Sequence, residues 1–444
     1  MKKIVSLIAF IALAALQTAG WRSPGPSPHS GVSLSSGTAS AAEGKTDVVL
    51  WNVFADNSDT GVFLSNAARD FTAENPEIKV TIVGQGGYDA VAERLEAAAA
   101  SGTLPTLAII EETFLGRFHP RAADLSKYVS KDTIDNYQKS LLASSRINGL
   151  LATLPFNRST PVLYVNRTLF DRSGVKGAPS TWDEFAVMAR KLSDPENGVF
   201  GAGICWDTDA WIFESVLYSF GGEIISPDNR TILFGRNDIA ANVVKLFQNM
   251  YNEGVLFNPY IHQDDPWAVI GSAFLNGKVA MFLGSNGMFG TYEKLMSEAG
   301  YELQLQTHPA GMDELSVATG GGNIIMFDSA TEAQKRAAGR LIEFLARDRY
   351  VTEYAALTGY LPTTVSSLET GVIKDLARRS PSYKIAYDQM RHAHRRPLTK
   401  NWKAIYKLLT EDLRRCLTYA DTDAASAMRD AAAACQKILD ENPD

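Results

Sequence analysis

The sequence has few cysteines, no long apolar run and no excess of positive charge, and each absence limits its function. Only three of its 444 residues are cysteine, an odd number that leaves at least one thiol outside any intramolecular disulfide. No uninterrupted apolar run reaches the roughly 18 residues typical of a membrane-spanning helix. The net charge of −7 comes without a basic domain, which argues against nucleic-acid binding as the main role.

Common catalytic and metal-binding motifs are also missing. There is no G-x-S-x-G sequence, and residues 271–278 have one residue too many for a phosphate-binding P-loop, with Val279 where that loop needs a hydroxyl. His392 and His394 form a pair without a cysteine or carboxylate motif beside it, so we expect neither a metal nor a cofactor. A secreted carbohydrate hydrolase is the rival interpretation, and it would need Glu111 or Glu112 to face one bond together with a second acid.

The first 45 residues have the composition of a signal peptide followed by a flexible leader. Met1-Lys2-Lys3 supplies positive charge, and residues 4–16 form an apolar run of 13 residues, which is too short to cross a membrane. Residues 18–20 and 39–41 are two candidate cleavage sites, and no cysteine follows the run to accept a lipid. We therefore expect a soluble protein exported to the periplasm or another extracytoplasmic space.

Strands and helices alternate in the next part of the chain. Residues 47–51, 78–83 and 105–110 have the composition of strands, and residues 88–101 have the periodicity of a helix. This βαβαβ order predicts a mainly parallel sheet covered by helices. Ligands of such sheets bind beyond the carboxyl ends of the strands, which here are predicted at residues 51–52, 84–88 and 111–113.

Residues 154–170, LPFNRSTPVLYVNRTLF, join this part to a second one. A polar step that includes Ser159 and Thr160 precedes the apolar β-run 162–165. We interpret the step as an extended crossover between two lobes, where both hydroxyls could bind a ligand; the alternative is an ordinary loop before a strand. The alternating pattern then resumes, with a strand at 199–206 and terminal helices at 402–419 and 423–439. Because single cores rarely exceed about 250–300 residues, this length predicts two domains.

Two tryptophans and two glycine-rich segments are candidates for ligand contact. Trp206 and Trp211 bracket a polar loop, where an indole could pack on the C–H face of a sugar or polyol; the alternative is core packing. Residues 284–287 precede a predicted helix, and residues 320–322 precede a predicted strand. Both could bring backbone N–H groups close to a ligand, and the alternatives are a plain turn or a hinge.

Several blocks of the sequence together resemble one known family. PFNRSTPVLYVNRTLFDRSGV resembles the crossover of the extracytoplasmic solute-binding proteins of ABC importers, family 1. FTAENPEIKV, GQGGYDAVAERL, PSTWDEFAVMARKL, TGGGNIIMF and TGYLPTTVSSLE occur in the order of its glycerol-3-phosphate-binding branch. The resemblance implies an α/β two-lobe periplasmic-binding-protein fold with a hinged cleft, each lobe a mainly parallel sheet flanked by helices. It assigns residues 46–157 and 318–357 to lobe 1, and residues 158–317 and 358–444 to lobe 2.

The resemblance and the crossover together place a set of residues at the cleft. The set comprises aromatic rings, hydroxyls, one carboxylate and one glycine: Tyr88, Glu112, Ser159, Trp206, Trp211, Ser285, Gly321, Tyr360 and Tyr406. Glu111 competes with Glu112, because either carboxylate could accept two hydrogen bonds from a vicinal diol. Which of the two tryptophans stacks on the ligand stays open.

The chain departs from the phosphate-binding members at one of these positions. They place an arginine about one turn into the helix that here begins near Trp402, and the aligned residue is Tyr406. A tyrosine cannot supply the permanent charge with which arginine binds phosphate. Compensation could come from nearby cations, namely Arg395, Arg396, Lys400, Lys403 and Lys407.

The resemblance implies a monomeric receptor that captures a small-molecule solute by cleft closure and presents it to the membrane permease of an ABC importer. The first expectation is glycerol-3-phosphate or a glycerophosphodiester, and the second is a neutral mono- or oligosaccharide. We do not expect an enzyme.

Cys416 and Cys435 lie on consecutive predicted helices and are the obvious disulfide pair. If these helices fold back about Thr422, the two positions are mismatched by seven residues, about 10 Å along the axis. A disulfide needs Cα atoms within about 7 Å. We therefore expect Cys205, Cys416 and Cys435 to be three reduced, buried side chains.

Overall fold

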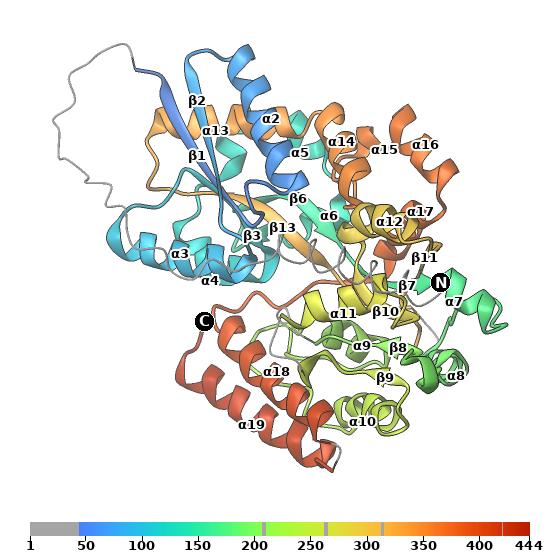
Figure 1. The fold of residues 1–444 in the computed structure, drawn as a ribbon. Helices are drawn as coiled ribbons and strands as arrows, with labels where there is room; N and C mark the ends of the chain where they lie inside the picture. Colours follow the sequence, from blue (N-terminus) through green and yellow to red (C-terminus); the bar gives the residue numbers. More distant parts are fainter. Residues whose placement is uncertain (1–43, 207–209, 262–264, 312–314, 420) are drawn as a thin grey trace, which may run out of the picture. The chain divides into compact units, whose positions relative to one another are not determined.

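Two five-stranded sheets organise the chain in the computed structural model, which describes residues 44–444 except 207–209, 262–264, 312–314 and 420 (Figure 1). The strand order is β2-β1-β3-β13-β6 in the first sheet and β11-β7-β10-β8-β9 in the second. Two smaller sheets pair β12 (Val317–Ala318) with β14 (Ala393–His394), and β4 (Arg146–Ile147) with β5 (Leu150–Leu151).

The first sheet combines the opening part of the chain with one late strand. Its strands are β2 (Ile78–Gly84), β1 (Thr46–Asn52), β3 (Leu107–Glu111), β13 (Gly320–Met326) and β6 (Thr153–Ser159). β1 is parallel to β2 and β3, while β13 is antiparallel to β3 and β6, so that only β13 runs against the others in this described sheet. The predicted βαβαβ order is confirmed, with α2 (Asp59–Glu74) and α3 (Tyr88–Ser101) as its helices.

Local signals in the sequence explain these two helices. The Ser58 side chain accepts a hydrogen bond from the Gly61 N–H and so caps the beginning of α2, and α2 ends before Pro76. On α3, Val91 and Leu95 recur at helical spacing and are fully buried. Each helix therefore covers the sheet with the apolar face that its sequence predicts.

The second sheet repeats this arrangement. Its strands are β11 (Leu303–Gln306), β7 (Pro161–Asn166), β10 (Met281–Ser285), β8 (Ala202–Gly203) and β9 (Leu256–Phe257). β7 is antiparallel to β10 and β11, and β8 is parallel to β10 and β9. The strand predicted at 199–206 is shorter than expected, and the Trp206 N–H donates to the Tyr260 hydroxyl instead of to a strand.

Helices flank both sheets along the described chain. The others of at least one turn are α4 (Leu115–Phe118), α5 (Lys131–Asn136), α6 (Lys139–Leu142), α7 (Arg167–Arg172), α8 (Trp182–Leu192), α9 (Trp211–Ser219), α10 (Ile239–Asn252), α11 (Pro266–Leu275), α12 (Phe289–Glu298), α13 (Glu332–Leu345), α14 (Asp348–Thr358), α15 (Val365–Leu368), α16 (Gly371–Arg379), α17 (Ser382–Gln389), α18 (Trp402–Thr418) and α19 (Ala424–Glu441).

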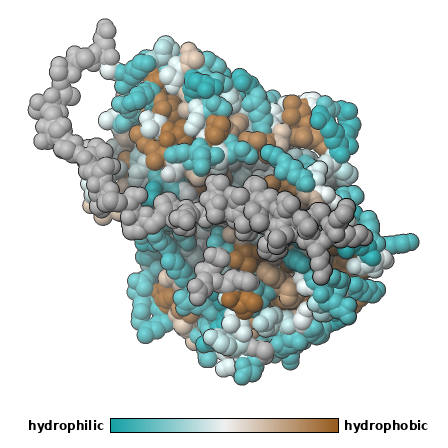
Figure 2. Space-filling view, in the orientation of Figure 1, coloured by the Kyte–Doolittle hydropathy of each residue, from teal (hydrophilic) through white to brown (hydrophobic). Residues whose placement is uncertain are grey.

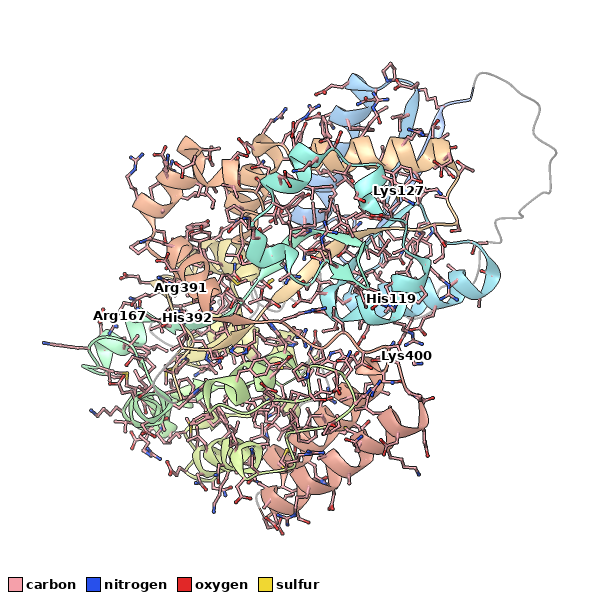
Figure 3. The ribbon with its side chains drawn as sticks, turned by 180° about the vertical axis from the view of Figure 1, so that it is seen from behind. His119, Lys127, Arg167, Arg391, His392 and Lys400 are labelled. Atoms are coloured by element: carbon pink, nitrogen blue, oxygen red, sulfur yellow. The ribbon has the colours of Figure 1, made fainter. Side chains whose placement is uncertain are left out.

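The predicted crossover is confirmed, because β6 belongs to the first sheet and β7 to the second. Thr160 between them is fully buried, its N–H donating to Asn286 Oδ1 at 2.8 Å and its hydroxyl accepting from Gln389 Nε2 at 2.9 Å. Two further segments of the chain run beside each other here, because β12 pairs with β14. Figure 3 shows the last of these, from His392 to Lys400, running between the parts of the chain that hold the two sheets. The exact lobe boundaries stay a prediction.

The remaining side chains form the core and the surface. Cys205, Cys416 and Cys435 are buried, and none of the three forms a disulfide, as predicted. Figure 2 shows polar residues over much of the visible face, with apolar patches among them. Among the described residues, no helix is both long enough and apolar enough to cross a membrane.

Candidate ligand-binding site

The carboxyl ends of the first sheet's strands gather polar residues beside the crossovers. β1 ends at Asn52, β3 at Glu111 and β6 at Ser159, and these three side chains are almost completely buried. Because the three strands run in the same direction, their ends share one edge of the sheet, where ligands of α/β proteins bind. The candidate site is therefore built from this edge outward.

Glu112, the carboxylate expected to bind the ligand, is fully buried and bonded within the protein. Arg158 Nη2 and the Ser144 hydroxyl donate to its Oε2, the latter at 2.9 Å, and the Thr319 hydroxyl donates to its Oε1. Burial raises the pKa of Glu112, but the charges of Arg158 and Arg396 and the Thr319 hydroxyl lower it more, so the pKa lies below its usual value. Glu112 is thus an ionised carboxylate with protein donors on both oxygens.

Arg396 connects two other buried carboxylates that come from different parts of the fold. Its Nη1 donates to Glu111 Oε1 at the end of β3, and its Nε donates to Glu214 Oε2 on α9, both at 2.8 Å. The three side chains are 5% exposed or less. The Tyr218 hydroxyl donates to Glu214 Oε1 at 2.7 Å. Burial raises the pKa of Glu214, although Arg396 and Tyr218 oppose the rise.

These five charged residues, Glu111, Glu112, Glu214, Arg158 and Arg396, are here called the buried charge cluster. Three carboxylates and two guanidiniums leave it with one net negative charge when all are ionised. Both of its cations are already bonded to carboxylates. The cluster therefore has no surplus positive charge for an anionic ligand.

Tyr88 and Tyr360, both expected at the cleft, converge on Asn157. Asn157 Nδ2 donates to the Tyr88 hydroxyl at 2.7 Å, and the Tyr360 ring stacks on Tyr354 with centroids 5.6 Å apart. A Cβ atom on Gly287 would lie 2.5 Å from the Tyr360 ring, so the glycine permits this close approach. Burial raises the pKa of both expected tyrosines, which keeps them neutral and able to donate hydrogen bonds.

Trp211 and Ser159 meet at Gly320. The Trp211 Nε1 donates to the Thr319 carbonyl at 2.8 Å. A Cβ atom on Gly320 would lie 2.5 Å from the indole and 3.0 Å from Ser159 Oγ. The structure thus brings these two expected residues together at the point where the chain re-enters the first sheet.

Ser285 and Gly321 shape the backbone of the crossovers. Ser285 Oγ accepts the Gly287 N–H at 3.1 Å, and the Ser285 carbonyl accepts the Tyr164 hydroxyl at 2.6 Å. Gly321 has a φ of 86°, and a Cβ atom there would lie 1.8 Å from the Asn157 carbonyl oxygen. Only glycine fits that position, whatever the ligand.

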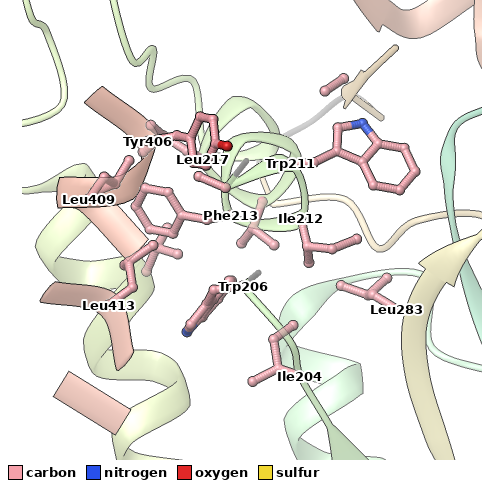
Figure 4. Close-up of a cluster of buried hydrophobic side chains, with 14 of the residues drawn as sticks. Ile204, Trp206, Trp211, Ile212, Phe213, Leu217, Leu283, Tyr406, Leu409 and Leu413 are labelled. Atoms are coloured by element: carbon pink, nitrogen blue, oxygen red, sulfur yellow. The ribbon is translucent and has the colours of Figure 1, made fainter. Parts of the chain in front are cut away.

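Trp206 and Tyr406 pack against or bond residues other than those above. Trp206 is 1% exposed and meets the rings of Phe213 and Phe247 edge-on, at 5.5 and 5.0 Å, and Figure 4 shows its indole and that of Trp211 pointing away from each other. The Tyr406 hydroxyl donates to Asp89 Oδ1 at 2.6 Å. Ligand contact by either residue stays a prediction, and Trp211 is the tryptophan that reaches the crossovers.

The sequence contained signals for the buried charge cluster that our interpretation did not use. Arg158 stands in the polar step of the crossover, and Arg396 was considered only as a substitute phosphate ligand. Glu214 is the one acidic residue of the apolar helix WIFESVLYS. Because a buried acid is rare without a partner, it could have indicated a buried cation.

Some buried polar atoms near the cluster have no hydrogen-bond partner in the described part of the chain. They are Asn157 Oδ1, Arg158 Nε and Asn323 Nδ2. Such atoms are costly when left unbonded, so a hydroxylated ligand or water would stabilise them. No group of three or more His, Cys, Asp or Glu side chains among the described residues is arranged to hold a metal ion.

Comparison with known proteins identifies a family and relatives of this chain. A family model described as bacterial extracellular solute-binding protein matches residues 66–380. The sn-glycerol-3-phosphate-binding periplasmic protein UgpB of Pectobacterium atrosepticum is 23% identical over 384 residues, which cover 82% of this chain and 84% of that relative.

Solved structures show the same fold. UgpB of Mycobacterium tuberculosis, in complex with glycerophosphocholine, has a TM-score of 0.78 and 19% identity, with 90% of this chain and 99% of that chain covered. The GacH receptor of Streptomyces glaucescens, solved unliganded and with acarbose, has a TM-score of 0.78 and 18% identity, with 89% and 99% covered. The predicted two-lobe periplasmic-binding-protein fold is confirmed.

Proposed function

The chain belongs to the family of bacterial extracellular solute-binding proteins, and we propose that it delivers a small, uncharged and hydroxyl-rich solute to its ABC importer. The solute class is a polyol or a mono- or oligosaccharide. This reverses the order of the two candidates that the sequence suggested, in which glycerol-3-phosphate or a glycerophosphodiester came first.

The buried charge cluster carries the proposal, because both of its cations bond carboxylates and it has no surplus positive charge. A phosphate monoester brings about 1.5 to 2 negative charges, which the cluster would repel. Two of the five cations considered as substitutes for the missing arginine are engaged elsewhere: Arg396 bonds two carboxylates, and Lys403 pairs with Glu93 at 3.0 Å. Tyr406, at the position of the arginine, carries no positive charge, and its hydroxyl donates to Asp89.

The groups at the strand ends favour hydroxyls as ligands. Tyr88, Tyr360, Asn157 and Ser159 are neutral hydrogen-bonding side chains, and the Trp211 indole lies beside Gly320, as Ser159 does. Polyol and sugar sites combine such polar groups with an aromatic face that packs on C–H groups. Glu112 and Glu111 would act mainly by holding Arg158 and Arg396, respectively, in place.

Export and delivery complete the proposal. The curated relative named above is a periplasmic protein, and the composition of residues 1–45 suits a signal peptide. The exported chain would act as a monomer, closing on its solute and presenting it to a membrane permease.

Native mass spectrometry and titration calorimetry test the solute class. We expect the full chain to bind at least one of glycerol, ribitol, maltose or a larger glucan, with an affinity that changes little between 50 and 500 mM salt. Binding of glycerol-3-phosphate that inorganic phosphate competes away and salt weakens would contradict the proposal. Product release from a glycoside probe would instead support the hydrolase.

A further inference from the structure

We propose that Tyr406 and Lys403 on α18 form a latch with Asp89 and Glu93 on α3, which holds the two lobes together without touching the solute. Its predicted effect on solute affinity rests on the function proposed above, whereas its effect on lobe opening does not. The four residues are here called the α3–α18 latch.

The geometry of the latch is a two-point contact between two helices. The Tyr406 hydroxyl donates to Asp89 Oδ1 at 2.6 Å, and Lys403 Nζ lies 3.0 Å from Glu93 Oε1. Asp89 and Glu93 are four residues apart on α3, while Lys403 and Tyr406 are three apart on α18. Both spacings place the paired residues on one face of their helix, so the two bonds form together.

Each bond of the latch pairs a shielded side chain of α18 with an exposed carboxylate of α3. Tyr406 is 5% exposed, and the Lys403 side chain is 13% exposed although its partner Glu93 is 61% exposed. The hydrogen bond and the charge of Lys403 lower the pKa of Glu93. Asp89 lies in the first turn of α3, where the helix dipole favours a negative charge.

The latch joins elements that otherwise belong to different sheets. α3 packs on β3 of the first sheet, whereas α18 packs on α10 and α19 beside the second. The two bonds span 317 and 310 residues of sequence. A contact present only when the lobes are together shifts the population toward that state, and it changes the affinity for every solute by the same factor.

The position of Tyr88 links the latch to the site. Tyr88 directly precedes Asp89 at the beginning of α3, so the latch lies one residue from a side chain expected at the site. Tyr406 itself is a positioning residue in this proposal. A solute contact by Tyr406 would instead change the affinity for one solute more than for another.

Lobe opening can be measured in the absence of any solute. Spin labels on Ser101→Cys at the end of α3 and Glu411→Cys on α18 report the separation of the two helices by pulsed electron paramagnetic resonance; both positions are exposed, and the native cysteines are buried. We expect Tyr406→Phe and Lys403→Met each to lower the ratio of short to long distances about 5- to 10-fold, as for loss of one partly exposed charged bond. Tyr419→Phe and Lys437→Met are matched controls on exposed positions and should leave the ratio unchanged.

Two results would overturn the latch. One is a distance distribution that neither Tyr406→Phe nor Lys403→Met alters, and the other is an unsubstituted chain that already shows only the long distance. With maltose and glycerol-3-phosphate as probes, Tyr406→Phe should raise the Kd of each probe that binds by the same factor. A rise for one probe alone would make Tyr406 a solute contact and contradict the latch. Failure of every neutral probe to bind would count against the proposed function and leave the distance result standing.

Discussion

Arg396 offers the sharpest test of how the site is held together. The substitution Arg396→Met keeps much of the side-chain volume and removes the guanidinium that bonds Glu111 and Glu214 at 2.8 Å. Both carboxylates then stay buried without their cation. Removing one partner of a buried ion pair costs about 3–5 kcal/mol, because the remaining charge is left uncompensated. We expect a loss in this range at pH 7 even though two carboxylates are affected, since Glu214 can take up a proton.

The assay is urea unfolding followed by circular dichroism and tryptophan fluorescence. Arg395→Met is the matched control, since the neighbouring Arg395 is exposed and its loss should change the free energy of unfolding by about 0.5 kcal/mol or less. Glu214→Gln added to Arg396→Met should restore part of the stability by removing one unpaired charge. An Arg396→Met protein within about 1 kcal/mol of the unsubstituted chain would refute the reasoning.

The pH dependence gives a second check on the same substitution. Without Arg396, the folded-state pKa of Glu214, which burial already raises, should rise further, because the guanidinium no longer opposes the effect of burial. A raised folded-state carboxyl pKa destabilises the fold as the pH rises above the unfolded-state pKa, and this penalty disappears when both states are protonated at lower pH. The stability deficit of Arg396→Met should therefore shrink as the pH falls from 7 toward 4.

Three further predictions concern other parts of the chain. Burial lowers the pKa of His308 to about 4. The contribution of the neutral histidine to the free energy of unfolding should therefore be complete above about pH 6.5 and fall by about 3 kcal/mol on acidification toward pH 4. His308→Gln should remove this loss from acid-unfolding curves. Trp206→Ala should cost about 3–5 kcal/mol of folding free energy, whereas Trp211→Ala should weaken solute binding by about 1–3 kcal/mol in calorimetry; the reverse pattern would contradict both assignments. Iodoacetamide should leave the three buried cysteines of the native chain unmodified and give three adducts after denaturation without reductant, while a single adduct would reveal a disulfide.

Elements with local signals could be predicted closely from the sequence. The helix predicted at residues 88–101 is α3 with the same bounds, because its apolar spacing lies within the segment and Gly102 directly follows its end. The crossover was also predicted, since a polar step before an apolar β-run is visible in one short stretch. The reversed direction of β13 was not, because its neighbours β3 and β6 lie far from it in the sequence.

The side-chain pairings at the site could not be predicted, because they join segments that are far apart in the sequence. Arg396 and Glu111 are 285 residues apart, and Tyr406 and Asp89 are 317 apart. Each residue taken alone is an ordinary charged or polar side chain in a helix or loop. Only the fold brings them to hydrogen-bonding distance, so a pairing that decides the charge of the site has no local pattern.

The different roles of Trp206 and Trp211 could not be predicted either, although the two residues are close in the sequence. They stand five residues apart and bracket one loop, so the sequence offered both as ring platforms with equal reason. Trp206 follows the short strand β8 and packs among Phe213 and Phe247, while Trp211 begins α9 and bonds the Thr319 carbonyl. A tryptophan's role depends on the direction of its side chain, which is fixed by the backbone it follows.

The positions of the two kinds of interlobe contact determine how binding and stability can be separated by experiment. The buried charge cluster joins the two parts of the chain through fully desolvated ion pairs, so substitutions there should change folding and solute binding together. The α3–α18 latch uses one partly exposed and one shielded bond at the edge of the same junction, and losing either leaves no uncompensated buried charge. Latch substitutions should therefore move the balance between open and closed lobes with little effect on unfolding. A melting temperature that falls as far in Tyr406→Phe as in Arg396→Met would show that the two contacts form one structural unit and would refute this separation.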